Sequence, residues 1–393
     1  MAAWLLAAYL LWPTDVPNDL KLPSVDERRL FGAALLDRVE HYERFLRWNG
    51  IASLVVLLAV LALYAWRGHR FARESAAGRI GTGMLLGMIG LALVWIAQLP
   101  FALAETWWQR RYGIVKAGYL EWLLENWLAL GAAFLFICLW LLITMALAAP
   151  LRDHWWLGAA PVFAGVALFF AFLQPYIVPD QHDPSPALAA DARRIAHATG
   201  QEGVELKVQA IGDKTRAPNA FAAGIGPSRR VVVWDTLLEK PFDRDEVRVV
   251  LAHEYGHQEK DHIWKGLAWY GLLSLPVLAL VARVARRWGG LYSPRAVPVA
   301  LFALVLVSVV TQPFGNLITR RMEAEADWVA LQTTCDPAAA RELFENFTKV
   351  ALAEPDPPEW AHVFFDTHPS IDQRIAEATA WERRNGGGSC STR

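Results

Sequence analysis

The sequence is poor in cysteine and has no basic tract. Its three cysteines show no C-x-x-C spacing, which argues against a disulfide framework and against a cysteine-rich zinc site. The formal net charge is −1 over 393 residues, and no run of Lys and Arg concentrates positive charge. Because phosphate binding needs a concentrated basic face, this composition argues against nucleic acid as a partner.

Charge is also missing from long stretches of the chain. Four stretches without charge reach roughly 20 residues or more, the length that crosses a bilayer as a helix. Two shorter ones qualify if their flanking Arg and Lys side chains extend to the interface. The opening Met1–Trp12 is apolar but only about half a membrane long. The long stretches are Gly81–Ala104, Trp127–Pro150, Trp155–Pro179 and Ala296–Thr319; the shorter ones are Ile51–Trp66 and Gly266–Ala282. We therefore expect a multi-pass α-helical membrane protein with about seven transmembrane helices in a lipid bilayer.

Two other regions have the pattern of a folded α+β domain. Val204–Ile211 alternates apolar and polar residues like a half-buried strand, and Arg230–Asp235 follows a Gly-Pro-Ser turn as a second strand. Between them, Asn219–Gly224 could be a short strand of small residues. Asp243 and Glu246 then have the spacing of a capping box, which predicts the start of a helix that runs on into the next apolar stretch.

That helix carries the main chemical signal, the motif His253-Glu254-Tyr255-Gly256-His257. Residues four apart share a helix face, so both imidazoles can reach one metal ion. Glu254 lies beside them, placed to take a proton from an attacking water. Imidazole and carboxylate ligands favour Zn²⁺, and we expect one zinc ion per chain.

A catalytic zinc ion needs a third protein ligand. His262 follows His257 by five residues, and on a continuous helix it points away from the zinc face. An acidic run after the last apolar stretch offers Glu323 and, on the same helix face, Asp327. Glu323 could be the ligand and Asp327 a residue that orients a histidine; alternatively the run is a solvated acidic turn.

A further candidate is His368, which precedes a proline in the segment His368-Pro-Ser-Ile-Asp-Gln-Arg374. The simpler interpretation is a surface loop. The functional interpretation is an electrophile that stabilises the oxyanion formed at an attacked carbonyl.

In this order, the motifs resemble the membrane metallopeptidases typified by type I CAAX prenyl endopeptidase (CAAX prenyl protease 1) and the related bacterial heat-shock membrane protease. The likeness extends from about Val25 to Glu377. The matching segments are Gln98-Leu-Pro-Phe, Gln174-Pro-Tyr-Ile-Val-Pro179, Asn219-Ala-Phe, Arg229 to Leu238, Ala252 to His257, Arg320 to Asp327 and His368-Pro-Ser.

The resemblance implies a gluzincin-like zinc-peptidase domain set among seven spans that enclose a large water-filled chamber. By position, it implies zinc ligands at His253, His257 and Glu323 and a general base at Glu254. It implies that Asp327 orients a ligand histidine and does not itself bind the zinc ion. It also implies that the substrate backbone or the transition state is contacted by Asn219, His368 and Arg374. The expected organisation is an N-terminal membrane domain at 1–179, the first part of the catalytic domain at 180–265, two transmembrane helices at 266–319, the second catalytic part at 320–385 and a disordered tail at 386–393.

The function expected from this resemblance is that of an integral-membrane zinc metalloendopeptidase with its catalytic domain on the cytosolic side. Its substrates would be CAAX-type, prenylated or other membrane-associated peptides and proteins. The short connection Glu239–Asp245 and the Ala-, Arg- and Trp-rich composition indicate a bacterial member in an inner membrane, where prenylated CAAX proteins are generally lacking.

Two alternatives stay open at this stage. One is a non-enzymatic, zinc-bound membrane scaffold. The other is a site-2-type intramembrane protease, which would bury its H-E-x-x-H motif within a span.

Overall fold

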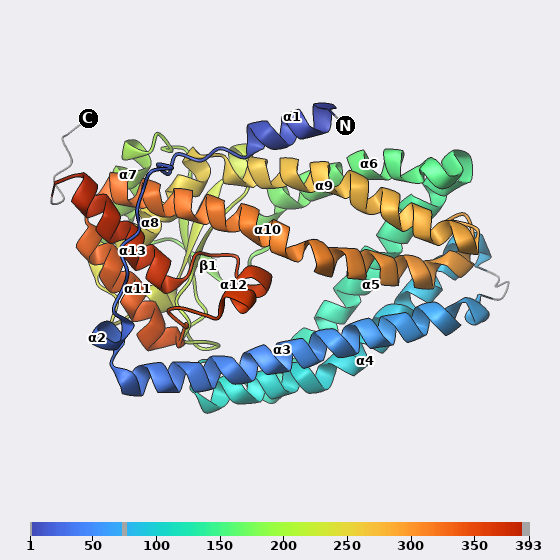
Figure 1. Cartoon of the computed structure of the whole chain (residues 1–393), viewed down its shortest axis with the longest axis horizontal. Coiled ribbons are helices and arrows are strands. Elements are labelled where there is room, and N and C mark those ends of the chain that lie inside the picture. Colours follow the sequence, from blue (N-terminus) through green and yellow to red (C-terminus); the bar gives the residue numbers. More distant parts are fainter. Residues whose placement is uncertain (1, 73–76, 387–393) are drawn as a thin grey trace.

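The computed structural model describes residues 2–72 and 77–386 (Figure 1). Except for Gly386, the predicted disordered tail at 386–393 lies outside the described residues. Long helices run along the molecule, and a small sheet lies at one end together with α7, α8, α11 and α13. The helices are α1 (Ala2–Leu11), α2 (Glu27–Phe31), α3 (Ala33–Arg67), α4 (Gly78–Arg111), α5 (Tyr119–Leu151), α6 (Trp155–Ile177), α7 (Pro186–Ala198), α8 (Arg244–Glu259), α9 (His262–Ala285), α10 (Val297–Thr334), α11 (Pro337–Ala351), α12 (Glu359–Phe365) and α13 (Ile371–Arg384).

Within the described residues, five helical stretches are long and apolar enough to cross a membrane. One of them, Tyr119–Ile177, folds back at the 3₁₀ turn Arg152–His154. Trp140 stacks on Phe163 and Phe136 packs on Phe170, with ring centroids 6.0 Å and 5.1 Å apart. These pairs run in opposite directions along the chain, so α5 and α6 form an antiparallel hairpin. The multi-pass helical prediction is therefore confirmed.

The apolar opening of the chain forms α1, which has 10 residues. At 1.5 Å per residue it is about 15 Å long, roughly half the hydrocarbon thickness of a bilayer. It lies against α9, where Trp4 Nε1 donates a hydrogen bond to the Leu272 carbonyl at 2.9 Å. The first segment of the predicted seven is thus a short helix supported by another helix.

The helices of the membrane region pack closely because α4 presents small residues to its neighbours. A Cβ at Gly83 would lie 2.2 Å from Met145 Sδ, and one at Gly87 would lie 2.4 Å from Leu141 Cδ1. Leu141 and Met145 of α5 are fully buried at this contact. Lipid tails are as apolar as these side chains, so close van der Waals packing of this kind stabilises helix pairs in a bilayer.

The sheet has the strand order β1-β2-β4-β3. The strands are β1 (Gln181–His182), β2 (Glu205–Gln209), β3 (Ala220–Ala223) and β4 (Arg230–Trp234). β2 and β4 are parallel, whereas β3 pairs antiparallel with β4 and lies at the edge. The three strands expected from the sequence are confirmed, and the two-residue β1 was missed because so short a segment has no periodicity of its own.

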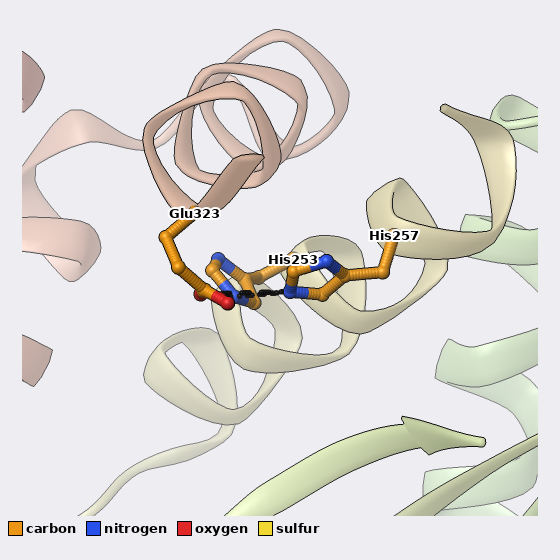
Figure 2. A group of neighbouring side chains, drawn as sticks. All are labelled: His253, His257 and Glu323. Atoms are coloured by element: carbon orange, nitrogen blue, oxygen red, sulfur yellow. Dashed lines mark hydrogen bonds and ion pairs between the residues drawn. The ribbon is translucent and has the colours of Figure 1, made fainter. Parts of the chain in front are cut away.

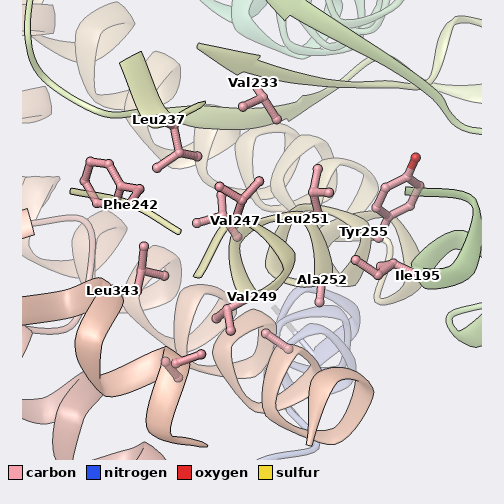
Figure 3. Close-up of a cluster of buried hydrophobic side chains, with 14 of the residues drawn as sticks. Ile195, Val233, Leu237, Phe242, Val247, Val249, Leu251, Ala252, Tyr255 and Leu343 are labelled. Atoms are coloured by element: carbon pink, nitrogen blue, oxygen red, sulfur yellow. The ribbon is translucent and has the colours of Figure 1, made fainter. Parts of the chain in front are cut away.

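One face of the sheet covers α8. Val231 and Val233 of β4 are fully buried together with Leu251 and Ala252 of α8, and Leu343 of α11 closes the same cluster (Figure 3). This apolar core holds α8 rigidly, as a helix that carries metal ligands requires.

The start of α8 confirms the predicted capping box. The Asp243 carboxylate accepts hydrogen bonds from the backbone N–H groups of Asp245 and Glu246, and Glu246 Oε2 accepts one from the Asp243 N–H at 2.7 Å. The predicted continuation of this helix into the next apolar stretch is wrong. α8 ends at Glu259, and Asp261 adopts a left-handed conformation with φ of 53° before α9 begins.

A buried carboxylate joins α7 to α8. The side chain of Asp191 is 3 % exposed and accepts hydrogen bonds from Arg244 at 2.6 Å and from Arg248 at 3.0 Å. Burial disfavours the charged carboxylate, but the arginines outweigh this effect and lower the pKa of Asp191 to about 2. The carboxylate stabilises the fold above its unfolded-state pKa of about 4, and this contribution is lost as the pH falls through about 2.

We expect Asp191→Asn to destabilise the protein by about 1–3 kcal/mol, because charge-assisted hydrogen bonds contribute about that much. The measurement is the thermal unfolding midpoint in detergent. The deficit should be constant between pH 5 and 8, where the wild-type carboxylate stays charged in both states. Asp183→Asn, which removes an exposed partner of Lys207, is the control and should leave the midpoint nearly unchanged. An equal effect of both variants would contradict the assignment.

Candidate metal centre

The two motif histidines lie one turn apart on α8 and face Glu323 of α10 (Figure 2). The Nε2 atoms of His253 and His257 are 3.0 Å apart. Glu323 of α10 places its Oε2 3.2 Å from His253 Nε2 and 3.6 Å from His257 Nε2. Two imidazole nitrogens and one carboxylate oxygen therefore converge on a single point.

This arrangement fits a zinc ion. Two ligand atoms about 2.1 Å from a tetrahedral ion lie about 3.4 Å from each other, close to the separations found here. Two imidazoles and one carboxylate are a donor set that suits Zn²⁺ and leaves a position open. The zinc prediction with Glu323 as third ligand is confirmed, and the alternative of a solvated acidic turn is wrong for this residue, which is 8 % exposed.

Asp327 and Arg374 fix the ring of His253. Asp327 Oδ1 lies 2.8 Å from His253 Nδ1. Arg374 in turn donates from Nε to Asp327 Oδ2 at 2.7 Å and from Nη2 to Oδ1 at 2.6 Å. When Nδ1–H donates to the carboxylate, the Nε2 lone pair is left free to bind a metal. The geometry thus brings Asp327 to the place that the sequence predicts.

The charges around His253 favour a cation. Burial disfavours the imidazolium, but the carboxylates of Asp327, Glu323 and Glu254 outweigh this and raise the pKa of His253 to about 10. The same negative field would stabilise a divalent ion at the Nε2 side. Burial also lowers the pKa of Arg374, but Asp327 more than offsets this and keeps the guanidinium charged.

The remaining predicted residues meet at one cavity of about 90 Å³ next to His253. Glu254 is 6 % exposed there and follows the first ligand directly. His368 has an exposed side chain whose Nε2 lies 3.2 Å from Glu323 Oε2. The cavity is lined by Glu254, Asn219, His368 and Arg374 together with the apolar side chains of Leu237, Val249, Val250, Leu343, Phe344 and Phe347.

Arg374 and Asn219 differ in how they could contact a substrate. Arg374 is 9 % exposed, and two of its nitrogens are held by Asp327. Asn219 stands immediately before the edge strand β3, and its Oδ1 accepts the backbone N–H of Ala220 at 2.9 Å. Direct substrate contact by Asn219, Arg374 or His368 stays a prediction.

The place of His262 differs from the one expected from the sequence. On a continuous helix this ring would point away from the zinc face. Because α8 ends and Asp261 turns the chain, His262 Nδ1 instead lies 2.8 Å from His257 Nδ1. The available signal was Asp261 itself, since Asp is one of the few residues other than Gly that adopts the left-handed conformation readily.

The H-E-x-x-H motif lies on α8, outside the five apolar stretches, and Glu323 follows the apolar part of α10. This position does not match a site-2-type protease, whose motif would lie within a span.

Comparison with known proteins agrees with this geometry. The sequence profile of peptidase family M48 matches residues 184–382, which contain all the residues of the centre. The crystal structure of S. mikatae Ste24p superimposes with a TM-score of 0.77 over 96 % of both chains at 15 % identity, which establishes the same fold.

Three named relatives have similar sequences. "Uncharacterized metalloprotease YhfN" of Bacillus subtilis is 28 % identical over 68 % of this chain. "Mitochondrial metalloendopeptidase OMA1" of Schizosaccharomyces pombe is 29 % identical over 52 %, and "Protease HtpX homolog" of Ligilactobacillus salivarius is 28 % identical over 40 %. The chain covers 66 %, 55 % and 62 % of the lengths of these three relatives.

We expect Glu323→Gln to lower zinc affinity by more than about 100-fold, because it removes a charged ligand, whereas loss of an outer residue costs 10–100-fold. Zinc per chain after gel filtration, measured by mass spectrometry of the metal, reports the loss. Glu345→Gln is the matched control, since this carboxylate pairs with Lys349 on α11, away from the centre. Stoichiometric zinc in Glu323→Gln would contradict the assignment.

Proposed function

Because this chain belongs to peptidase family M48, we propose that it is an integral-membrane zinc metalloendopeptidase that hydrolyses peptide bonds. The main observation that supports this proposal is a group of three possible zinc ligands next to a cavity that Glu254 lines. The three ligands are His253, His257 and Glu323. The names of the relatives, a metalloprotease, a metalloendopeptidase and a protease, support the same chemistry.

In the proposed reaction, Glu254 is the general base. Its carboxylate accepts a proton from the attacking water while the water oxygen bonds to the carbonyl carbon of the substrate. A zinc ion held by His253, His257 and Glu323 would supply Lewis acidity, which would polarise the carbonyl and make the water more acidic. Glu254 then gives the proton to the amide nitrogen as the carbon–nitrogen bond breaks, so that an acid and an amine leave.

In this proposal His368 would be the oxyanion donor. Its Nε2 lies 3.2 Å from Glu323 Oε2, and its side chain is 54 % exposed, which supports this role. A hydrogen bond from this nitrogen would stabilise the negative charge that develops on the carbonyl oxygen.

The substrate would bind as an added strand. β3 is an edge strand: it pairs with β4 along one side, and no strand of the described sheet pairs with its other side. α8 lies close to β3, because Gln258 of α8 donates a hydrogen bond to the Ala223 carbonyl at 3.3 Å. An extended peptide beside Ala220–Ala223 could form main-chain hydrogen bonds and pass over the centre, with Asn219 at one end.

We further propose that the substrates are membrane-associated peptides and proteins, prenylated ones among them. The helix that carries Glu323 also contains one of the five apolar stretches, so the centre would lie near the bilayer, which supports this substrate class. On family resemblance, the catalytic domain faces the cytoplasm of a bacterial inner membrane.

Glu254→Ala should abolish cleavage, by at least about 1,000-fold, while zinc stays bound, because the variant removes the base and keeps all three ligands. Peptide cleavage and metal content are measured on the same purified sample. Retained cleavage would reject the role of Glu254. Loss of zinc together with cleavage would leave the base untested, and Glu254→Gln, which keeps the side-chain size, then decides.

Substrate class is tested with a farnesylated CAAX peptide beside its unprenylated twin. Cleavage of both, lost in Glu254→Ala, is the result expected for a general membrane peptidase. Cleavage of the prenylated peptide alone would narrow the function to a prenyl endopeptidase. If neither peptide is cut although zinc is present, the proposed substrates are wrong, and a zinc-bound scaffold becomes the better interpretation.

A further inference from the structure

The two histidine ligands are supported in different ways. Asp327 contacts the outer nitrogen of His253 directly. The outer nitrogen of His257 meets His262 instead, with the two Nδ1 atoms 2.8 Å apart. His262 Nε2 then lies 2.9 Å from Glu325 Oε2. His262 and Glu325 are 5 % and 1 % exposed, so this second support is fully inside the protein.

Only one arrangement of protons satisfies this chain of contacts when His257 binds a metal through Nε2. A neutral ligand imidazole then carries its proton on Nδ1, which donates to Nδ1 of His262. His262 must accept there, so its own proton lies on Nε2 and is donated to the Glu325 carboxylate. Every N–H in the series has an acceptor, and the series ends on a negative charge.

Glu325 also contacts the segment Trp12–Pro17, which we call the strap. Its Oε1 accepts the backbone N–H of Asp15 at 2.7 Å, and Lys265 Nζ lies 3.3 Å from its Oε2. The Asp15 carboxylate pairs with Lys260 Nζ at 2.8 Å, at the end of α8.

An aromatic side chain anchors the start of the strap. Trp12 packs edge-on against Trp269 of α9, with ring centroids 6.5 Å apart, and the Arg321 guanidinium of α10 lies 4.5 Å from the Trp12 ring centroid. Arg321 also donates to the Trp12 carbonyl at 3.2 Å. The strap therefore contacts α9 and α10 and, through Lys260, the end of α8.

We propose that His262, Glu325 and the backbone N–H of Asp15 form a positioning relay that fixes the ring and tautomer of His257 for zinc binding. The strap is thereby part of the metal centre, although it supplies none of the three ligand atoms. Loss of any member of the relay weakens zinc binding. The relay rests on the zinc site of the proposed function but not on peptidase activity.

The test measures the zinc dissociation constant of the full-length protein in detergent by competition with a chromophoric chelator. His262→Ala and Glu325→Gln should each weaken binding by about 10–100-fold, the range for residues that orient a ligand. Asp15→Pro, which removes the backbone donor, should weaken it in the same direction. His262→Gln, whose amide can accept from His257 and donate to Glu325, should recover affinity relative to His262→Ala.

A spectroscopic readout and a control variant distinguish a positioning role from a general loss of stability. The visible spectrum of the Co²⁺-substituted protein should change in His262→Ala and Glu325→Gln, because the geometry of the His257 ligand changes. Asp19→Asn is the matched control: it removes the contact of the same N-terminal region with Arg384, away from the relay, and should leave zinc affinity and spectrum unchanged.

Wild-type zinc affinity and cobalt spectrum in both His262→Ala and Glu325→Gln would overturn the relay. Equal weakening by Asp19→Asn would overturn it as well, since the effect would then be general. If the wild-type protein binds zinc and cuts no peptide, the proposed function fails, whereas the relay is still decided by the dissociation constants.

Discussion

The packing of α10 on α8 is the contact on which the metal centre depends. A Cβ at Gly256 would lie 3.1 Å from Val329 Cβ, so the glycine within the H-E-x-x-H motif lets the two helices approach closely. That approach brings Glu323 into reach of two histidines on the other helix. The sheet packs on the opposite face of α8, so α8 lies between the sheet and α10.

Close packing alone would not keep so many charges buried. Glu323, Glu325 and Asp327 follow one another on α10 and are all nearly inaccessible to water. Isolated carboxylates in such a place would be strongly disfavoured. Each carboxylate has a partner here. Glu323 pairs with the ligand histidines, and Glu325 pairs with His262 and Lys265. Asp327 pairs with Arg374 and His253. The intervening residues 324 and 326 are alanines, which leave room for the close contact.

Local features were predictable from the sequence, and features that depend on distant contacts were not. The capping box at Asp243 and the pair of histidines involve residues three or four apart, so spacing alone places them correctly. Spacing left Glu323 undecided, because nothing local brings α10 to α8, and family resemblance was needed. The helix break at Asp261 was missed because no Gly or Pro marks it and a helix resumes at once, at His262. The family and the fold are confirmed, whereas the finer resemblance to prenyl endopeptidases stays a prediction.

The order of the ligands along the chain has a consequence for biogenesis. His253 and His257 precede the antiparallel pair α9 and α10, whose Trp269 and Phe314 rings lie 6.1 Å apart, and Glu323 follows the apolar part of α10. A nascent chain can therefore complete the metal site only after this hairpin has entered the bilayer and folded back. Glu323 is the last of the three ligands to be made, so the site stays incomplete until α10 packs on α8. Correct insertion is in this way a precondition for loading the metal.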